Sequence, residues 1–187
     1  GGEYHPLVDL AITHYQFETI HPCSDGNGRL GRILIVLQLL KAGYLSDPYL
    51  YPSAYFNRNK QEYVEKMRAV SEEGNWRDWI AFFIEGIEEQ ARDSYERTFE
   101  LIELRREYEE QYQSQKTSHK LARNLFELPY FTANDITQRF NVSRQTAYNA
   151  IEEVEADGLV VEVTGQQRNR EYRAVDIFDI LERAPHR

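Results

Sequence analysis

Apolar positions in the first forty residues recur at helical spacing and predict two helices separated by a polar loop. Pro22 and the Ser-Asp-Gly-Asn-Gly run that follows end the first helix near Ile20. The second helix begins near Arg29, and apolar side chains surround it on nearly all sides as far as Leu40, which predicts a central, buried helix. One side of the first helix carries Leu7, Leu10, Ala11, His14 and Phe17.

The middle of the chain predicts a loop and then further helices, the last of them long and charged. Two prolines mark the loop in SDPYLYPS, and a helix is expected from about Ser53 to Glu73, before a turn at Gly74-Asn75. The next helix opens at Trp76 and continues or restarts through EEQARDSYERTFELIELRREYEEQYQSQ. Acids and bases spaced four apart in that stretch are typical of a long solvated helix that joins two units.

The last seventy residues change character and predict shorter elements. Helical patterns cover about 118–127, 132–140 and 143–157, and Ser143 is a suitable N-cap for the third of these helices. After Gly158, the stretch LVVEVTGQQRNREYRAV predicts two strands around a Gly-Gln turn. Three short helices followed by a β-hairpin is the order of elements in a winged helix-turn-helix domain.

Together these patterns predict a mainly α-helical protein with a small α+β domain at its end. We expect a helical core in residues 1–88, a helical linker in 89–116 and a winged helix-turn-helix domain in 117–187. The opening GGEYHPLV resembles a cut through a longer protein, so we expect that an N-terminal part of the core is missing.

Composition and charge narrow the functional classes. The single cysteine, Cys23, excludes a disulfide within the chain and favours a reducing compartment. The longest apolar run is too short to span a bilayer and no basic-then-apolar leader opens the chain, so we expect a cytoplasmic protein without membrane partners. The net charge of −9 argues against general nucleic-acid affinity, although a local basic face is compatible with it. The oligomeric state is left open, and a homodimer is one of the alternatives.

The loop IHPCSDGNGR combines features that suit a bound phosphate. Gly26 and Gly28 lack a Cβ and let the backbone approach a ligand closely. The loop leads into a helix N-terminus, where free N–H groups and the helix dipole favour an anion. Arg29 and Arg32 lie in the first turns of that helix, although the dipole disfavours cations there. A ligand that offsets this local conflict is the simplest explanation of it.

Two further residues of the loop supply chemistry. Asp25 is a hard oxygen ligand suited to a Mg²⁺ ion that keeps most of its waters and bridges phosphates. His21 lies just before the loop, and an imidazole with an ordinary pKa of about 6.5 is a suitable general base near neutral pH. A lone Gly-Asn-Gly is usually only a turn and a lone histidine is usually structural, but here all the pieces occur within twelve residues.

The stretch HPCSDGNGRLGR resembles the signature of the Fic family, His-Pro-Phe-x-Asp/Glu-Gly-Asn-Gly-Arg-x-x-Arg. The similarity covers about Pro6 to Ile87, including HYQFETIHP, AGYL, LYPSAYFNRNKQEYVEKM and GNWRDWIAFFIEGI, and more loosely the winged-helix tail. The resemblance therefore implies that the helical core is a Fic core and that the protein is a protein adenylyltransferase. Such an enzyme moves AMP from Mg²⁺-bound ATP to a Ser, Thr or Tyr hydroxyl of a target protein and releases pyrophosphate.

The resemblance also implies a role for each residue of the signature. His21 would take the proton from the target hydroxyl, and Asp25 would hold Mg²⁺ on the α- and β-phosphates. Arg29 would support the phosphate-binding loop, and Arg32 would meet the γ-phosphate. The ATP- and phosphate-binding residues would be Gly26, Asn27, Gly28, Arg29 and Arg32.

The stretch NKQEY resembles the family's Asn-Arg-x-x-Tyr and makes Asn59 and Tyr63 candidates for the adenine pocket, with core packing of Tyr63 as an equal alternative. Cys23 replaces the family's phenylalanine, and we expect it to be buried as a small hydrophobe. The bulky lysine of the phosphate-transferring subgroup is missing near Gly28, which favours AMP transfer. An inhibitory Ser/Thr-x-x-x-Glu-Gly/Asn motif is not found in the chain and is expected upstream in a longer parent.

The winged-helix tail offers an alternative of a different class, a DNA-binding or protein-docking regulator whose Fic site is weakly active or removes AMP. Residues 117–187 hold nine Lys and Arg against eleven Asp and Glu, a net charge of −2 that makes DNA binding less favoured than protein docking. Acids cluster toward the end of the expected recognition helix, whereas its start and the wing carry bases. The candidate DNA contacts are Arg144, Gln145, Asn149, Arg168 and Arg170.

Overall fold

A computed structural model describes residues 4–166 and 168–183 of the chain. The fold is mainly α-helical with one small sheet, as the sequence predicts. The chain forms two compact units, Gly1–Tyr95 and Glu96–Arg187, and they divide within a single helix. The sequence-based division at residues 88 and 116 stays a prediction. Within the described residues, every helix is too short or too polar to cross a membrane.

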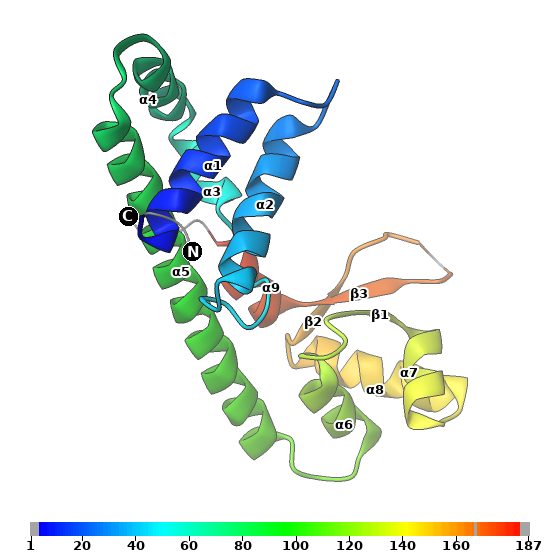
Figure 1. Cartoon of the computed structure of the whole chain (residues 1–187). Coiled ribbons are helices and arrows are strands. Elements are labelled where there is room, and N and C mark those ends of the chain that lie inside the picture. Colours follow the sequence, from blue (N-terminus) through cyan, green and yellow to red (C-terminus); the bar gives the residue numbers. More distant parts are fainter. Residues whose placement is uncertain (1–3, 167, 184–187) are drawn as a thin grey trace. The chain divides into compact units, whose positions relative to one another are not determined.

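The first unit is a bundle of helices around an aromatic core. Its helices α1 (Pro6–Ile20) and α2 (Asn27–Lys41) pack side by side (Figure 1) and are joined by the signature loop. The short α3 (Ser53–Arg58), then α4 (Lys60–Glu73) and the first part of α5 (Trp76–Gln111) complete the bundle. Trp79 is fully buried, and its Nε1–H donates to the Ala11 carbonyl at 3.0 Å, which fixes α5 against α1.

Local sequence explains where α1 begins and ends. His5 is the N-cap, its ring accepts the Leu7 N–H, and Pro6 follows at the first helical position, where a missing N–H costs nothing. At the other end His21 adopts the left-handed conformation with φ of 50°, and its N–H closes the helix on the Phe17 carbonyl. The candidate base is therefore the C-cap of α1.

The prediction that α2 is buried on all sides is wrong. Ile35 and Leu39 lie in the core, but the side chains of Ile33 and Leu37 are 54% and 52% exposed, and Leu30 is exposed too. The residue pattern shows how apolar a helix is, but not how many neighbours cover it, and α1 covers one face of α2. Apolar content alone therefore overestimated the burial of this helix.

Two further predictions for the middle of the chain have different outcomes. The single helix expected over 53–73 is two helices, because Asn59 leaves helical geometry and its amide donates to the Tyr55 carbonyl at 3.1 Å. The turn at Gly74 is confirmed, with a left-handed φ of 68°. The charged stretch does continue the helix begun at Trp76, so that α5 runs for 36 residues. Tyr108 in its last turn and Tyr112, just after its end, belong to the core of the second unit.

The second unit has the elements expected of a winged helix-turn-helix and two more. Helices α6 (Thr117–Asn124), α7 (Ala133–Phe140) and α8 (Arg144–Ala156) are confirmed, as is the hairpin of β2 (Val160–Glu162) and β3 (Glu171–Ala174). The strand β1 (Tyr130–Thr132) and the helix α9 (Val175–Glu182) were not predicted. The sheet has the order β1-β3-β2, all antiparallel, with Phe131 opposite Tyr172.

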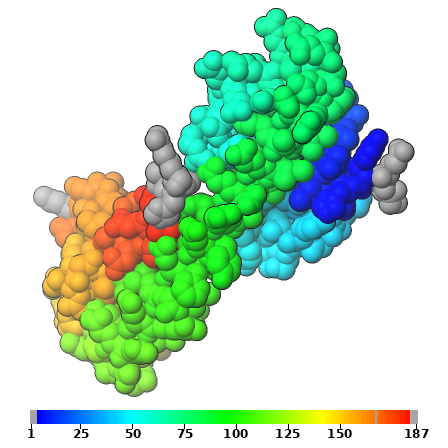
Figure 2. Space-filling model, turned by 90° about the vertical axis from the view of Figure 1, so that its left-hand side faces the viewer, coloured from blue at the N-terminus to red at the C-terminus, as the bar shows by residue number. Residues whose placement is uncertain are grey.

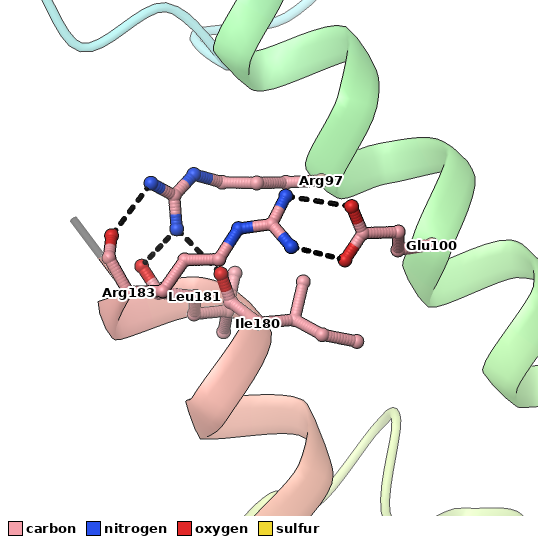
Figure 3. Close-up of polar contacts among 5 residues, drawn as sticks. All are labelled: Arg97, Glu100, Ile180, Leu181 and Arg183. Atoms are coloured by element: carbon pink, nitrogen blue, oxygen red, sulfur yellow. Dashed lines mark hydrogen bonds and ion pairs between the residues drawn. The ribbon is translucent and has the colours of Figure 1, made fainter. Parts of the chain in front are cut away.

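The unpredicted helix α9 packs on the second part of α5 (Figure 2) through a polar clamp shown in Figure 3. Arg183 pairs with both carboxylate oxygens of Glu100, at 2.5 and 2.6 Å. Arg97 donates to the carbonyls of Ile180, Leu181 and Arg183, which are the otherwise open end of α9. The clamp joins residues more than eighty positions apart, so no local pattern could indicate it.

Candidate functional site

The candidate site is the loop between α1 and α2 together with the first turns of α2. Gly26 is the N-cap of α2, with a left-handed φ of 80°, and within the described part of the chain no side chain caps the helix. The Leu30 N–H makes the first intrahelical bond, to the Gly26 carbonyl at 3.0 Å, so the N–H groups before it face outward from the helix end. The start of α2 thus presents free donors and a positive dipole end to an anion.

Asn27 holds the loop in shape. Its side chain is 2% exposed overall, and its amide oxygen accepts the Cys23 N–H at 2.9 Å while its amide nitrogen donates to the Cys23 carbonyl at 2.6 Å. The side chain therefore closes the turn, and only the Asn27 backbone remains for a ligand. The sequence placed Asn27 among the phosphate-binding residues but did not reveal this supporting role of its side chain.

The two arginines of the signature differ in their surroundings. Arg29 is exposed, and its Nη2 lies 3.6 Å from Oδ2 of the exposed Asp25. Arg32 is half-buried, and its Nε donates to Ser53 Oγ at 2.9 Å, a contact the sequence did not reveal. A Cβ at Gly28 would lie 3.1 Å from Arg32 Nη1, so glycine leaves room for the guanidinium beside the helix start. Arg32 is thereby held beside Gly28, in the first turn of α2.

Both arginines line a cavity of about 560 Å³ between α2 and the segment 48–57. Its remaining wall is mainly apolar and includes Leu37, Leu40 and Tyr51. The cavity is large enough for a small organic ligand, and its positive end coincides with the loop. The exposed apolar face of α2 forms part of this wall.

The outward residues of the loop are accessible to solvent. His21 is exposed beside the loop, at the end of α1. Cys23 is also exposed, so the expectation that it is buried as a small hydrophobe is wrong. The reason is the Asn27 contact: both backbone groups of Cys23 bind that amide, and this fixes the loop without any need to bury the thiol.

A metal ion would have one carboxylate of the loop available. Among the described residues, no cluster of three or more His, Cys, Asp or Glu side chains could hold a metal alone. Asp25 is exposed, and one of its oxygens accepts the Gly26 N–H at 2.7 Å, which orients the carboxylate and leaves lone pairs free. A single oriented carboxylate fits Mg²⁺, which keeps several waters and takes its other ligands from phosphates.

The two adenine-pocket candidates lie elsewhere in the first unit. Asn59 breaks the helix between α3 and α4, and Tyr63 lies in the aromatic cluster, 5.5 Å from the Trp79 ring centre. The Tyr63 hydroxyl pairs with His14 Nε2 at 2.9 Å, and burial raises its pKa. Neither Asn59 nor Tyr63 is among the described residues that line the cavity beside Arg32, and their role in adenine binding stays a prediction.

The structure brings some of the candidate DNA contacts together. Arg144 and Arg170 line one cavity of about 410 Å³ in the second unit, together with Tyr148 and Asn169. Arg144 lies over the Tyr148 ring at 5.9 Å. Gln145 and Asn149 are exposed on α8 and bonded to each other at 2.8 Å, while Arg168 is exposed but does not line the cavity.

Comparison with known proteins agrees with this organisation. Residues 2–39 match the model of the Fic/DOC family, and residues 117–171 match that of an HTH domain. The chain is 33% identical over 98 residues to "Protein adenylyltransferase Fic" of Aedes aegypti, which covers 52% of this chain and 17% of that protein. The protein of the same name in Drosophila yakuba is 37% identical over 78 residues, 42% of this chain and 14% of that protein.

The chain thus spans less than a fifth of the length of these curated relatives. Among solved structures, a Fic family protein from Desulfovibrio desulfuricans G20 matches with a TM-score of 0.49 and 22% identity, over 94% of this chain and 51% of that chain. The signature loop, the two family matches and the relatives agree with one another. Residues 2–39 of the chain are thus similar to the Fic/DOC family, and residues 117–171, in its C-terminal unit, to an HTH domain.

Proposed function

We propose that this protein is a protein adenylyltransferase, which transfers AMP from Mg²⁺-bound ATP to a Ser, Thr or Tyr hydroxyl of a target protein. One observation carries the proposal: an exposed imidazole and an oriented carboxylate lie in or beside the loop that leads into the open N-terminus of α2, and the first turns of that helix carry two arginines. The names of the curated relatives support the reaction class.

The phosphates of ATP would lie on the start of α2. The backbone N–H groups of Asn27 and Gly28 would donate to them, since no side chain among the described residues caps this helix start. Arg32, held by Ser53, would bind the terminal phosphate, and Arg29 the phosphates nearer the loop. Donors that are already oriented need no rearrangement when charge develops on the phosphate oxygens.

His21 would act as the general base. The ring takes the proton of the acceptor hydroxyl. At the same time the hydroxyl oxygen bonds to the α-phosphorus, and the α–β phosphoanhydride bond of ATP breaks. The electron pair of that bond leaves with pyrophosphate, and AMP stays on the acceptor. His21 lies at the end of α1, next to the loop, and is exposed, so its ring is accessible to a side chain of the target protein.

Asp25 would hold Mg²⁺ together with phosphate oxygens and waters. When bound, the ion neutralises phosphate charge and makes pyrophosphate a better leaving group. The Gly26 N–H that Asp25 accepts would keep the carboxylate in place during the exchange of ligands.

Labelled ATP tests the proposal. The protein is incubated with an extract of cellular proteins and with ATP labelled at either the α- or the γ-phosphorus. We expect protein-bound label from α-labelled ATP only, and a loss of about 10²–10⁴-fold in His21→Ala because the general base is gone. His119→Ala, in the second unit, is the matched control and should keep the full rate. Label from the γ-position, or undiminished transfer in His21→Ala, would contradict the proposal.

A second candidate function is DNA binding by the second unit. It is favoured by the joint lining of one cavity by Arg144 and Arg170, at the start of α8 and in the wing, next to the exposed Gln145. Titration of a fluorescent duplex at several salt concentrations tests it. Affinity that falls steeply with salt and is weakened in Arg144→Ala supports DNA binding. Affinity that is insensitive to salt or unchanged in Arg144→Ala favours protein docking instead.

A further inference from the structure

An apolar stripe on α2 lies beside the candidate site and is open to solvent. Ile33, Val36, Leu37 and Leu40 follow one another at spacings of one, three or four positions, so they lie along one side of the helix over two turns. All four line the cavity of about 560 Å³, and the side chains of Ile33 and Leu37 are more than half exposed. Contiguous apolar side chains that remain accessible on a folded protein commonly mark a binding site.

The opposite wall of the cavity is a segment of restricted backbone, residues 48–52. Pro48 and Pro52 fix the backbone angle φ at its two ends, and Leu50 between them is buried in the core of the first unit. Tyr51 lines the cavity and is exposed. A wall that is held in place before a ligand arrives loses little freedom when the ligand binds.

The charge of the cavity is positive and lies toward its end at the start of α2. Arg29 and Arg32 line it there, and the described residues that line the cavity include no carboxylate. Arg32 donates from Nε to Ser53 Oγ at 2.9 Å, a contact that orients the guanidinium without adding a negative charge. The exposed pair of Arg29 and Asp25, at 3.6 Å, is weakly held. This end of the cavity therefore suits an anion.

Phosphate binding alone does not account for the apolar stripe. The phosphates of ATP would use Arg29 and Arg32, whereas the stripe begins at Ile33 and runs away from the helix start as far as Leu40. Polar groups lose hydrogen bonds to water when they lie on an aliphatic wall, so the stripe suits an apolar body. A ligand that uses both parts of the cavity combines an anion with an apolar chain.

We propose that this cavity binds a single-chain anionic amphiphile, whose carboxylate or phosphate lies on Arg29 and Arg32 and whose alkyl chain lies along Ile33, Leu37 and Leu40. The binding does not rest on the proposed transferase function. One consequence does rest on it: because the head group takes the arginines assigned to the phosphates of ATP, the amphiphile and ATP exclude each other.

Size and charge favour this ligand over a protein partner. A cavity of about 560 Å³ matches a small organic molecule, whereas a helix with its side chains is about 10 Å across. A two-fold contact of this face with a second copy would bring arginines together without acids from the same lining to pair with them.

A series of alkyl phosphates tests the proposal on the whole chain. Isothermal titration calorimetry is done with butyl, hexyl and octyl phosphate, each below its micellar concentration, and with inorganic phosphate and octanol. We expect the affinity to rise about two- to fourfold with each added CH₂ group and to be at least about tenfold lower for octanol than for octyl phosphate. Octanoate distinguishes a carboxylate from a phosphate head group, and binding of either octyl anion supports the site.

Two pairs of matched variants locate the ligand. Ile33→Ser should weaken octyl phosphate binding about 5- to 20-fold, while Val64→Ser, an equally exposed aliphatic residue on α4 outside this cavity, should not. Arg32→Gln should weaken it at least about tenfold, while the exposed Arg68→Gln should not. Ile33 is more than half exposed, so its serine variant should fold, and the chain-length series needs no variant.

Three results would overturn the proposal. The first is an affinity that does not rise with chain length, or that is equal for octanol and octyl phosphate. The second is equal weakening by Ile33→Ser and Val64→Ser. The third is a dimer in light scattering that Ile33→Ser dissociates, without affinity for octyl phosphate, since a second copy would then cover the stripe.

Competition with ATP separates this proposal from the proposed function. Saturating octyl phosphate should weaken ATP binding at least about tenfold, because both use Arg29 and Arg32. Unchanged ATP affinity with octyl phosphate bound would overturn the placement of the head group. If the wild type binds no ATP, the transferase function fails, and the chain-length series alone decides on the amphiphile.

Discussion

The N-termini of helices α2 and α8 carry similar residues but differ in their N-caps. Both α2 and α8 have an arginine in the first turns, and both follow a loop with small polar residues. The start of α8 is capped by Ser143, whose Oγ accepts the Thr146 N–H at 3.1 Å. The start of α2 has Gly26 at the same position, in a left-handed conformation and without a side-chain cap.

The difference in capping determines which kind of ligand each helix start suits. At α8 the Ser143 side chain satisfies one of the free donors, the Thr146 N–H, so a partner is reached through the side chains of Arg144, Gln145 and Asn149. At α2 the donors remain open, and the loop is instead stabilised from below by the buried Asn27. An open helix start over a well-supported loop suits a small anion, whereas a capped start suits a contact between side chains and a large partner.

The largest expected difference between the two starts is in catalysis. Arg32→Ala should lower the rate of AMP transfer by about 10²–10³-fold, because it removes an oriented cation from the terminal phosphates. Arg144→Ala, the matched change at the other helix start, should leave the rate unchanged. Single-turnover transfer from α-labelled ATP measures both. Equal loss in the two variants would show that the transfer does not depend on the start of α2.

The next largest expected effect is that acid lowers the stability of the first unit through one buried histidine. Burial lowers the pKa of His14 in the first unit to about 4. Below the ordinary histidine pKa of about 6.5 the unfolded chain binds a proton that the folded chain does not, so stability is full above that pH and falls between it and about 4. The loss should reach about 3 kcal/mol.

Urea unfolding at about pH 7 and about pH 4 measures this loss, and His14→Gln removes the titrating group. The difference between the two proteins isolates His14 from the acidic side chains that also titrate. An equal fall in stability in wild type and His14→Gln would contradict the assignment of the loss to His14.

A third prediction concerns the Asn27 side chain, which holds the loop before α2 in shape. Asn27→Ala deletes the amide that binds both backbone groups of Cys23 and should cost about 2 kcal/mol of unfolding free energy, since two partly buried groups lose their partner. It should also weaken ATP binding, because the loop is no longer held. Calorimetry of binding and urea unfolding measure the two effects, with the exposed Asn134→Ala as control. Weakened stability with unchanged ATP binding would separate the loop from the nucleotide.

Much of this organisation could be predicted from local sequence. The signature loop, the helices around it, the Ser143 cap and the order of helices and hairpin in the second unit depend on neighbours within a few residues, and the structure has them. The candidate residues His21, Asp25, Arg29 and Arg32 come from one compact motif in the same way, and their roles stay predictions.

Other features depend on residues distant in the chain, and local patterns could not reveal them. Ser53 meets Arg32 across 21 positions, and Glu18 lies against Gly31 only because α1 packs on α2. One face of α2 is exposed because no neighbouring element among the described residues covers it, and the hydrophobicity of the helix itself does not indicate this. Helix α9 was missed because its partners on α5 lie more than eighty residues away.

The smallest expected effect is at the capped start. Ser143→Ala removes the acceptor of the Thr146 N–H and should cost about 1 kcal/mol of unfolding free energy, the usual value of an N-cap. Ser143→Gly should cost less, because glycine leaves the open N–H accessible to water. Thermal unfolding measures both, while AMP transfer should stay at the wild-type rate, since α8 carries none of the proposed phosphate donors. A loss of transfer in a folded Ser143→Ala protein would mean that the two helix starts are not independent.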